Sequence, residues 1–259
     1  MSEILKNIPE TVKIYEYLNP YSSREDVTKF VGGCVRDIIL GIPIKDIDLA
    51  TKLLPEKVIE LLNQKKIKTS DHAIKFGVVS AEVNNLKFEI TTLRQDLSSD
   101  GRYAKVAFTK DWNVDAERRD FTINSIYYSM NKNKKKDTFY DPYNGKNDLL
   151  NGKINFIKKP DISIEEDFVR ALRYFRFFLQ YSKSEHDPIV LDSIFKNKVN
   201  IRNISKNRMK LEMKKIVLTG SYKKLLNSES IKNFFYFIYP DSKELFCLEV
   251  EKAINFFDN

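Results

Sequence analysis

The chain has 259 residues, of which 42% are hydrophobic and 31% are charged, and its formal net charge is +8 at neutral pH. This length allows one large or two modest domains, and the composition is typical of a soluble globular protein. No apolar stretch reaches the roughly 18 residues that a membrane span needs, and the N-terminus lacks a signal-peptide pattern. Cys34 and Cys247 form neither a disulfide framework nor a zinc motif. We therefore expect a cytoplasmic protein that does not enter a membrane.

Helices and strands alternate in the first part of the chain. The periodicity predicts, in order, a helix over 12–18, a strand ending at 30–31, a helix over 35–40, a strand over 44–49 and a helix over 55–62. Residues 77–83 and 86–91 predict a hairpin that turns at Asn84 and Asn85. These elements together predict a small mixed or mostly antiparallel sheet flanked by helices.

Loops and then helices follow this sheet. Residues 94–111 are polar and contain glycine, which predicts a mobile loop, and the Lys/Asn-rich residues 131–137 predict a turn between two strands. Helical periodicity dominates after Pro160, so a domain boundary near residue 150 is expected. The predicted fold class is therefore α+β, with an all-α second part.

Two short motifs lie close together near the N-terminus. Gly32 and Gly33 end a strand and open a helix, where free backbone N–H groups can bind a triphosphate. Asp46 and Asp48 alternate along a strand, so their side chains share one face and can hold divalent metal together. Such paired carboxylates suit two-metal phosphoryl transfer. Either motif alone is more often a turn or a solvated strand edge, but their order and spacing favour function.

Further polar residues have the chemistry of a nucleotide site. Glu89 lies on a later strand and is either a third carboxylate at the metals or a charge at a strand edge. Arg118 and Arg119 suit phosphate, while Asp120 and Asn124 suit a ribose hydroxyl. The alternative for this run is a helix start with solvated arginines.

Residues 165–179 predict an amphipathic helix with its apolar stripe at three- and four-residue spacing. Asp167 and Arg170 fall one turn apart on its polar side, where an acceptor beside a donor fork matches cytosine and adenine and rejects uracil and guanine. The alternative is an ordinary intrahelical ion pair. Arg173 lies one step further round the polar face, and Arg176 points away from Asp167.

A basic stretch follows this helix. Residues 196–224 contain ten lysines and arginines and one acidic residue, Glu212. Such a stretch attracts phosphate backbones, and the alternative is a solvated face of a lysine-rich protein. The candidate RNA-binding residues are Lys206, Arg208, Lys210, Lys214 and Lys215.

Taken in order, these motifs resemble those of the class II tRNA nucleotidyltransferases, which are the bacterial-type CCA-adding enzymes, and of their poly(A) polymerase relatives. The matching runs are residues 32–37, 46–51, 118–124, 141–149, 166–170 and 205–212. The resemblance implies a catalytic nucleotidyltransferase head over 1–150, a helical neck that recognises the base over 151–220, and a short helical body remnant over 221–259. The family normally carries substantial body and tail domains beyond that point.

The resemblance also implies roles for individual residues. Asp46 and Asp48 would bind two Mg²⁺ ions, and Glu89 would join them as a catalytic residue. The nucleotide, CTP or ATP, would be bound by Gly32, Gly33, Arg36, Arg118, Arg119, Asp120, Asn124, Asp167, Arg170, Arg173 and Arg176. Residues 93–102 resemble a loop that CCA-adding enzymes need for the final A. The partner would be the 3′ acceptor end of tRNA, and no obligate protein partner is implied.

The expected activity is template-independent addition of C, C and A to tRNA. A-only or poly(A) addition would use the same residues. A catalytically silent RNA-binding module is a further alternative, which the presence of Asp46, Asp48, Arg36, Asp167 and Arg170 argues against. A phosphohydrolase with a His-Asp metal motif needs several histidine ligands. The chain has only His72 and His186, so that class is excluded.

Overall fold

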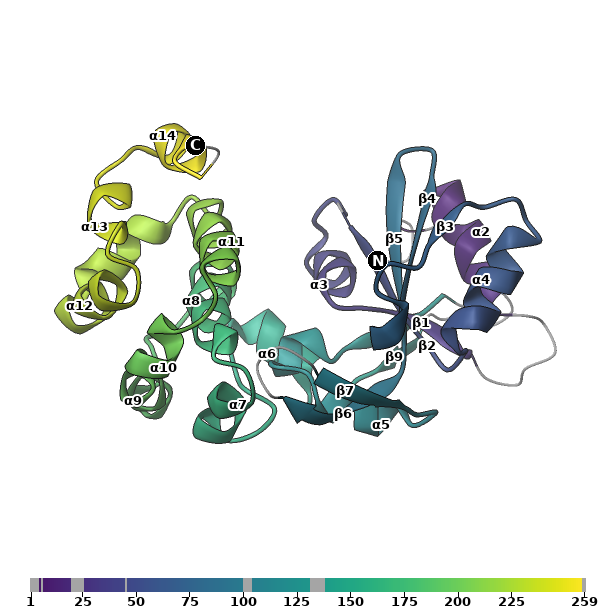
Figure 1. The fold of residues 1–259 in the computed structure, drawn as a ribbon, viewed down its shortest axis with the longest axis horizontal. Coiled ribbons are helices and arrows are strands. Elements are labelled where there is room, and N and C mark those ends of the chain that lie inside the picture. The colour runs from purple at the N-terminus through teal and green to yellow at the C-terminus, as the bar shows by residue number, and fades with distance from the viewer. Residues whose placement is uncertain are drawn as a thin grey trace. The chain divides into compact units, whose positions relative to one another are not determined.

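The computed structural model describes residues 5, 7–19, 26–44, 46–99, 104–130 and 138–257. The chain forms two compact units, Met1–Leu150 and Asn151–Asn259 (Figure 1). The further division of the second unit at residue 220 stays a prediction. In the described part of the chain, no helix combines the length and the apolar character that crossing a membrane requires.

The first unit combines helices with a mixed sheet, as predicted for the α+β class. Its elements are α2 (Pro9–Leu18), β1 (Thr28–Val31), α3 (Gly33–Leu40), β2 (Ile47–Thr51), α4 (Pro55–Asn63), β3 (Thr69–Ser70), η1 (Ile74–Phe76), β4 (Val78–Val83), β5 (Leu86–Thr92), β6 (Arg94–Ser99), β7 (Ala104–Phe108), α5 (Trp112–Glu117), η2 (Thr122–Asn124), β8 (Tyr127–Ser129), β9 (Thr138–Tyr140) and α6 (Gly145–Asn151). The main sheet has the strand order β3-β4-β5-β2-β1-β8-β9.

Most neighbouring strands in this sheet are antiparallel, and β2 and β5 form a parallel pair. The predicted hairpin is confirmed: β4 and β5 are joined at Asn84 and Asn85, whose φ angles are 50° and 65°. Two successive left-handed residues make the tight turn that matches strand twist, and asparagine tolerates this conformation better than most residues.

The two faces of the sheet differ in chemistry because side chains alternate along each strand. Phe30, Leu49, Ile90 and Val79 are register partners across four strands, and all are buried. The ring of Tyr15 on α2 stacks on Phe30 at 5.1 Å between centroids. Helices α2 and α4 lie on this side of the sheet, and α3 lies on the other (Figure 1).

The prediction of a loop over 94–111 was wrong, because β6 and β7 pair there as an antiparallel hairpin. The guanidinium of Arg94 donates to the carbonyl of Phe76, and the ring of Phe108 covers Gly77 so closely that a Cβ on that glycine would lie 2.7 Å from it. Contacts with η1 therefore hold the hairpin despite its polar sequence. Residues 100–103 at its tip lie outside the described residues.

Two other predicted segments need comment. The strand predicted over 44–49 begins at Ile47 and ends at Thr51, so the prediction was displaced towards the N-terminus. The turn predicted over 131–137 lies outside the described residues, but the strands on either side, β8 and β9, pair antiparallel as expected.

The second unit is helical, as predicted. Its elements are α7 (Pro160–Glu166), α8 (Val169–Tyr181), α9 (Pro188–Lys196), α10 (Lys198–Arg202), α11 (Lys206–Val217), η3 (Tyr222–Asn227), α12 (Glu229–Ile238), α13 (Ser242–Leu245) and α14 (Val250–Asn255). Helices α8 and α11 pack against each other. Aromatic side chains form the core, with Phe175 5.0 Å from Phe235 and Phe235 5.6 Å from Phe246 between ring centroids.

The helix predicted over 165–179 is interrupted. Helix α7 ends at Glu166, and Asp167 has the extended φ of −156°. The Asp167 side chain accepts a hydrogen bond from the backbone N–H of Val169 at 3.1 Å. A short acidic side chain that bonds its own backbone in this way competes with the helix, and α8 therefore starts afresh at Val169.

Candidate active site

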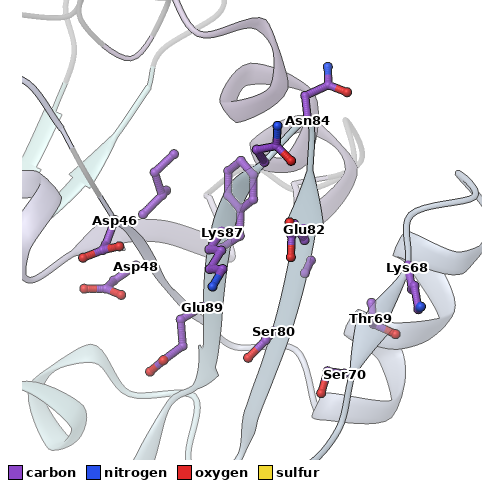
Figure 2. Close-up of a pocket in the computed structure, with 14 residues that line it drawn as sticks. Asp46, Asp48, Lys68, Thr69, Ser70, Ser80, Glu82, Asn84, Lys87 and Glu89 are labelled. Atoms are coloured by element: carbon purple, nitrogen blue, oxygen red, sulfur yellow. The ribbon is translucent and has the colours of Figure 1, made fainter. Parts of the chain in front are cut away.

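Three carboxylates gather on the polar face of the sheet in the first unit. Asp48 on β2 and Glu89 on β5 are register partners in a parallel pair, so their side chains point to the same face. Asp46 lies directly before β2, and Figure 2 shows its carboxylate beside that of Asp48 with Glu89 nearby. Burial and then the charge of Glu89 raise the pKa of Asp48 to about 6.

These carboxylates stand at one end of an open pocket of about 930 Å³ (Figure 2). The pocket extends from Asp48 and Glu89 across β4 to β3. Polar side chains line most of it, among them Lys68, Ser70, Ser80 and Lys87.

Gly32 and Gly33 place the start of α3 against the carboxylates. Gly32 has a φ of +74°, and a Cβ on it would lie 3.2 Å from Oδ2 of Asp48. Only glycine satisfies both demands without strain. One turn into α3, the buried guanidinium of Arg36 donates to the side-chain oxygen of Asn124. The helix start, Arg36 and the carboxylates therefore converge on one place.

Asp120 holds Asn124, which is the hydrogen-bond partner of Arg36. One oxygen of Asp120 accepts hydrogen bonds from the backbone N–H of Phe121 at 2.9 Å and from the amide of Asn124 at 2.7 Å. Asn124 thus connects Asp120 to Arg36. Contact of Asp120 and Asn124 with a ribose hydroxyl stays a prediction.

Asp115 anchors both arginines of the run 118–124. It accepts hydrogen bonds from Arg118 at 2.9 Å and from Arg119 at 2.9 and 3.2 Å. The hydroxyl of Tyr127 donates to Asp115 at 2.7 Å and accepts from Arg119. Burial opposes ionisation of Asp115, but the charges of Arg119 and Arg118 outweigh it and hold its pKa below the usual range. We did not predict this residue, although its three- and four-residue spacing from the arginines is the signal of a helical ion pair.

A close backbone contact fixes the same run from the side of α6. A Cβ on Gly145 would lie 2.0 Å from the carbonyl oxygen of Thr122, so only glycine fits. The hydroxyl of Thr122 donates to Asp148 at 2.7 Å, and Asp141 accepts from the backbone N–H of Gly145 at 2.8 Å. The segment 141–149 therefore acts as a brace for η2.

The candidate base-reading residues lie in the second unit, and they have different partners from those predicted. Arg170 is buried and donates to the Ser163 hydroxyl at 2.9 Å and to Glu166 at 2.8 Å. Asp167 accepts two hydrogen bonds from Arg208, at 2.9 and 2.8 Å. The expectation that Asp167 and Arg170 form one helical pair was wrong, because the chain is extended at Asp167.

The other two arginines of α8 have different contacts. Arg176 donates to Glu212 of α11 at 3.0 Å, and its direction away from Asp167 agrees with the prediction. The guanidinium of Arg173 lies 5.5 Å from the ring centroid of Phe177. The Arg176–Glu212 ion pair therefore connects α8 to α11, and the Asp167–Arg208 pair connects α11 to the segment just before α8.

The basic stretch is only partly available to a ligand. Lys206, Arg208 and Lys210 are exposed on α11. Arg208, however, is paired with Asp167, and Lys215 donates to Glu212 at 3.1 Å. Lys214 is half-buried. Lys206 and Lys210 are therefore the most accessible of the predicted RNA-binding residues.

The donor set of the first unit fits a hard divalent cation. Its oxygens come from carboxylates, and burial together with the neighbouring charge of Glu89 raises the pKa of Asp48, so a bound cation would stabilise the ionised carboxylate. Within the described residues, no three His, Cys, Asp or Glu side chains form a metal site by themselves. Mg²⁺ commonly takes one or two protein carboxylates and completes its shell with substrate phosphates.

Comparison with known proteins agrees with this geometry. Residues 28–155 match the family model of the poly(A) polymerase head domain. The chain is 38% identical over 202 residues to the human protein named CCA tRNA nucleotidyltransferase 1, mitochondrial. This alignment covers 77% of the chain and 45% of that relative. It is 30% identical to a CCA-adding enzyme of Staphylococcus epidermidis over 88% of the chain and 55% of the relative.

Solved structures show the same fold. The crystal structure of the Bacillus stearothermophilus CCA-adding enzyme in complex with CTP matches with a TM-score of 0.73 and 28% identity, over 95% of the chain and 57% of that structure. A Thermotoga maritima CCA-adding enzyme complexed with tRNA matches with a TM-score of 0.64 and 23% identity, over 82% of the chain and 48% of that structure.

Fold and site together define a nucleotidyltransferase head followed by a helical region. More narrowly, the chain belongs to the family of class II CCA-adding enzymes and poly(A) polymerases. It spans about half the length of the relatives that it matches.

Proposed function

We propose that this protein adds C, C and A to the 3′ end of tRNA from CTP and ATP, without a nucleic-acid template. The observation that carries the proposal is the convergence of Asp46, Asp48 and Glu89 with Arg36 and the glycine turn. The relatives named as CCA-adding enzymes support it, since they match along most of this chain.

In the proposed reaction, the RNA 3′ hydroxyl attacks the α-phosphorus of the nucleotide and pyrophosphate leaves. Backbone N–H groups at Gly33 and the guanidinium of Arg36 would bind the phosphates, which their position beside Asp48 allows. Asp46 and Asp48 would hold two Mg²⁺ ions, with Glu89 beside them. Bound there, Mg²⁺ supplies charge stabilisation for the attacking and leaving oxygens.

Arg118 and Arg119 would contact the nucleotide from a fixed position. Asp115 and Tyr127 hold both guanidinium groups before any ligand arrives, so little side-chain freedom remains to be lost on binding. Preorganised charge of this kind is what a phosphoryl-transfer site requires.

Asp167 and Arg170 would read the incoming base, supported by Arg173 and Arg176. Arg170 is held by Ser163 and Glu166, which orients its donors. Asp167 is held by Arg208, which keeps its carboxylate in place as an acceptor. Lys206 and Lys210 would contact the tRNA backbone.

The deciding experiment supplies tRNAs that lack one, two or three terminal nucleotides and offers CTP, ATP, UTP and GTP one at a time. The proposal requires C on the tRNA that lacks three nucleotides and on the tRNA that lacks two, and A on the tRNA that lacks one. An enzyme that adds only A, and that adds it to any RNA, would instead be a poly(A) polymerase.

Asp46→Asn and Asp48→Asn test the metal assignment. Each removes charge without removing bulk, and we expect turnover to fall by about 10³-fold or more while tRNA binding persists. Glu60→Gln, on an exposed carboxylate of α4, is the control. Full activity of either aspartate variant would remove the assignment.

The cytoplasmic location stays a prediction from composition.

A further inference from the structure

The pocket beside the carboxylates extends over strands that the nucleotide-binding groups do not use. Arg36 comes from α3, which follows β1, and Asn124 comes from η2, which precedes β8. Both β1 and β8 lie on one side of β2 in the sheet order, whereas β5, β4 and β3 lie on the other. The phosphate-binding groups and the pocket therefore flank Asp48 on opposite sides.

A single polar row marks the floor of this pocket. Asp48, Glu89, Ser80 and Ser70 are successive register partners across β2, β5, β4 and β3. Their side chains share the face that carries the carboxylates, and Figure 2 shows Glu89, Ser80 and Ser70 in this order away from Asp48. Hydroxyl groups at this spacing offer both donors and acceptors to a polar ligand.

Two lysines border the row. Lys87 on β5 and Lys68 next to β3 line the pocket and are exposed. Neither has a hydrogen bond or an ion pair within the described part of the chain. The acidic side chains of the pocket are Asp46, Asp48 and Glu89 at its end and Glu82 opposite Lys87 in the register. Lys68 therefore lies at the far end of the pocket from the proposed metal site, whereas Lys87 lies two residues before Glu89 on the same face of β5.

The geometry of in-line displacement indicates which substrate group approaches Asp48 from the side of β5. The attacking oxygen and the leaving pyrophosphate lie on opposite sides of the phosphorus. Because the triphosphate would lie on the side of α3 and η2, the attacking hydroxyl must arrive from the side of β5. This step rests on the proposed function.

We propose that the floor formed by Glu89, Ser80 and Ser70 is the binding surface for the last nucleotides of the acceptor RNA, with Lys87 and Lys68 facing their phosphates. The terminal 3′ hydroxyl then reaches Asp48 along the row. The two lysines would neutralise the phosphates of the RNA. The serine hydroxyls would form hydrogen bonds with its sugars and base edges. An RNA single strand is held in this way largely without sequence preference.

The test uses the full chain and an acceptor-stem minihelix that ends in C-C and awaits A. The variant Lys68→Ala/Lys87→Ala is compared with Lys57→Ala/Lys65→Ala, which removes the same charge from exposed lysines on and next to α4. Steady-state addition gives the KM for RNA and the KM for ATP separately. Fluorescence anisotropy without nucleotide gives the minihelix Kd at several salt concentrations.

We expect Lys68→Ala/Lys87→Ala to raise the RNA KM and Kd roughly tenfold and to reduce the salt slope of binding by about 1.4, with the KM for ATP unchanged. Ser80→Tyr is a second test. Ser80 is exposed on β4, so the fold should tolerate a tyrosine ring there, but the ring would obstruct the RNA. RNA affinity equal to that of the control in both variants would overturn the proposal. If the unmodified protein binds the minihelix but adds no nucleotide, the proposed function fails, and the anisotropy still decides the RNA surface.

Discussion

Gly32 approaches Asp48 so closely that a methyl group on the glycine would lie 3.2 Å from the carboxylate oxygen Oδ2. The substitution Gly32→Ala would therefore displace a proposed metal ligand and also force alanine into a φ of +74°. The backbone cost is about 1–3 kcal/mol of the free energy of unfolding, because a ψ of −131° at this φ is essentially restricted to glycine. The Asp48 carboxylate must give way by a few tenths of an ångström, and we expect nucleotide addition to fall by roughly tenfold, since small displacements in such a site reduce the rate.

Gly41 offers the matched control for this prediction. Its φ is +71°, and no atom lies within 4 Å of the position of an added Cβ. Gly41 adopts the left-handed α conformation, so Gly41→Ala should lower the free energy of unfolding in urea by about 1–2 kcal/mol and leave the rate of addition unchanged. Equal activity of the two alanine variants would show that the approach of Gly32 to Asp48 has no functional role.

Asp115 pairs with both Arg118 and Arg119, so its charge should contribute to the stability of the fold. In Asp115→Asn, Arg118 and Arg119 would lose the carboxylate that they share while staying largely buried, and we expect the free energy of unfolding to fall by about 3–5 kcal/mol. Asp111→Asn, at the exposed start of α5, is the control, because asparagine caps a helix as well as aspartate does. A loss of less than about 1 kcal/mol in urea unfolding of Asp115→Asn would contradict this prediction, since that is the range of an exposed pair.

Local signals in the sequence predicted much of the sheet and of the catalytic motifs. Asn84 and Asn85 determine their turn by backbone preference, and Asp46, directly before β2, lies beside Asp48 on that strand. Both properties depend on neighbouring residues alone. The proximity of Glu89 to Asp48 could be offered only as one of two alternatives, because it depends on the parallel pairing of β2 with β5.

What the sequence did not predict depends on contacts between distant segments. The Arg94 guanidinium donates a hydrogen bond to the carbonyl of Phe76. This contact helps to hold the polar residues of β6 and β7 in an ordered hairpin. Asp167 leaves the helix because its carboxylate bonds the N–H of Val169 and pairs with Arg208, which lies 41 positions later. Amphipathic spacing continues unbroken through Asp167 and gives no sign of either contact.

Arg170 should determine which nucleotides are accepted. Removal of its guanidinium in Arg170→Ala leaves the base edge without its donors, and we expect the preference for CTP and ATP over UTP and GTP to fall by roughly 100-fold. Single-turnover addition with each nucleotide measures this directly. Lys198→Ala, on the exposed surface of α10, is the control. Continued exclusion of UTP and GTP would contradict the assignment of Arg170 as a base reader.

His186 should make the stability of the protein depend on pH. Its ring stacks on Phe178 at 3.5 Å between centroids, and Nδ1 lies 3.2 Å from the hydroxyl of Tyr174. Burial lowers the pKa of His186 to about 4, below the ordinary value of about 6.5 that applies in the unfolded chain. Between these values the unfolded state binds more protons than the folded state, so the free energy of unfolding falls as the pH decreases from about 6.5 to about 4.

Urea unfolding at pH 7 and pH 5, followed by helical circular dichroism, measures this dependence. The unfolding midpoint of the unmodified protein should be lower at pH 5. In His186→Gln the difference between the two midpoints should shrink, because the titrating group is gone, whereas His72→Gln removes an exposed imidazole and should leave the difference unchanged. A difference that persists in full in His186→Gln would assign the pH dependence to other groups and leave His186 as a packing residue between α8 and α9.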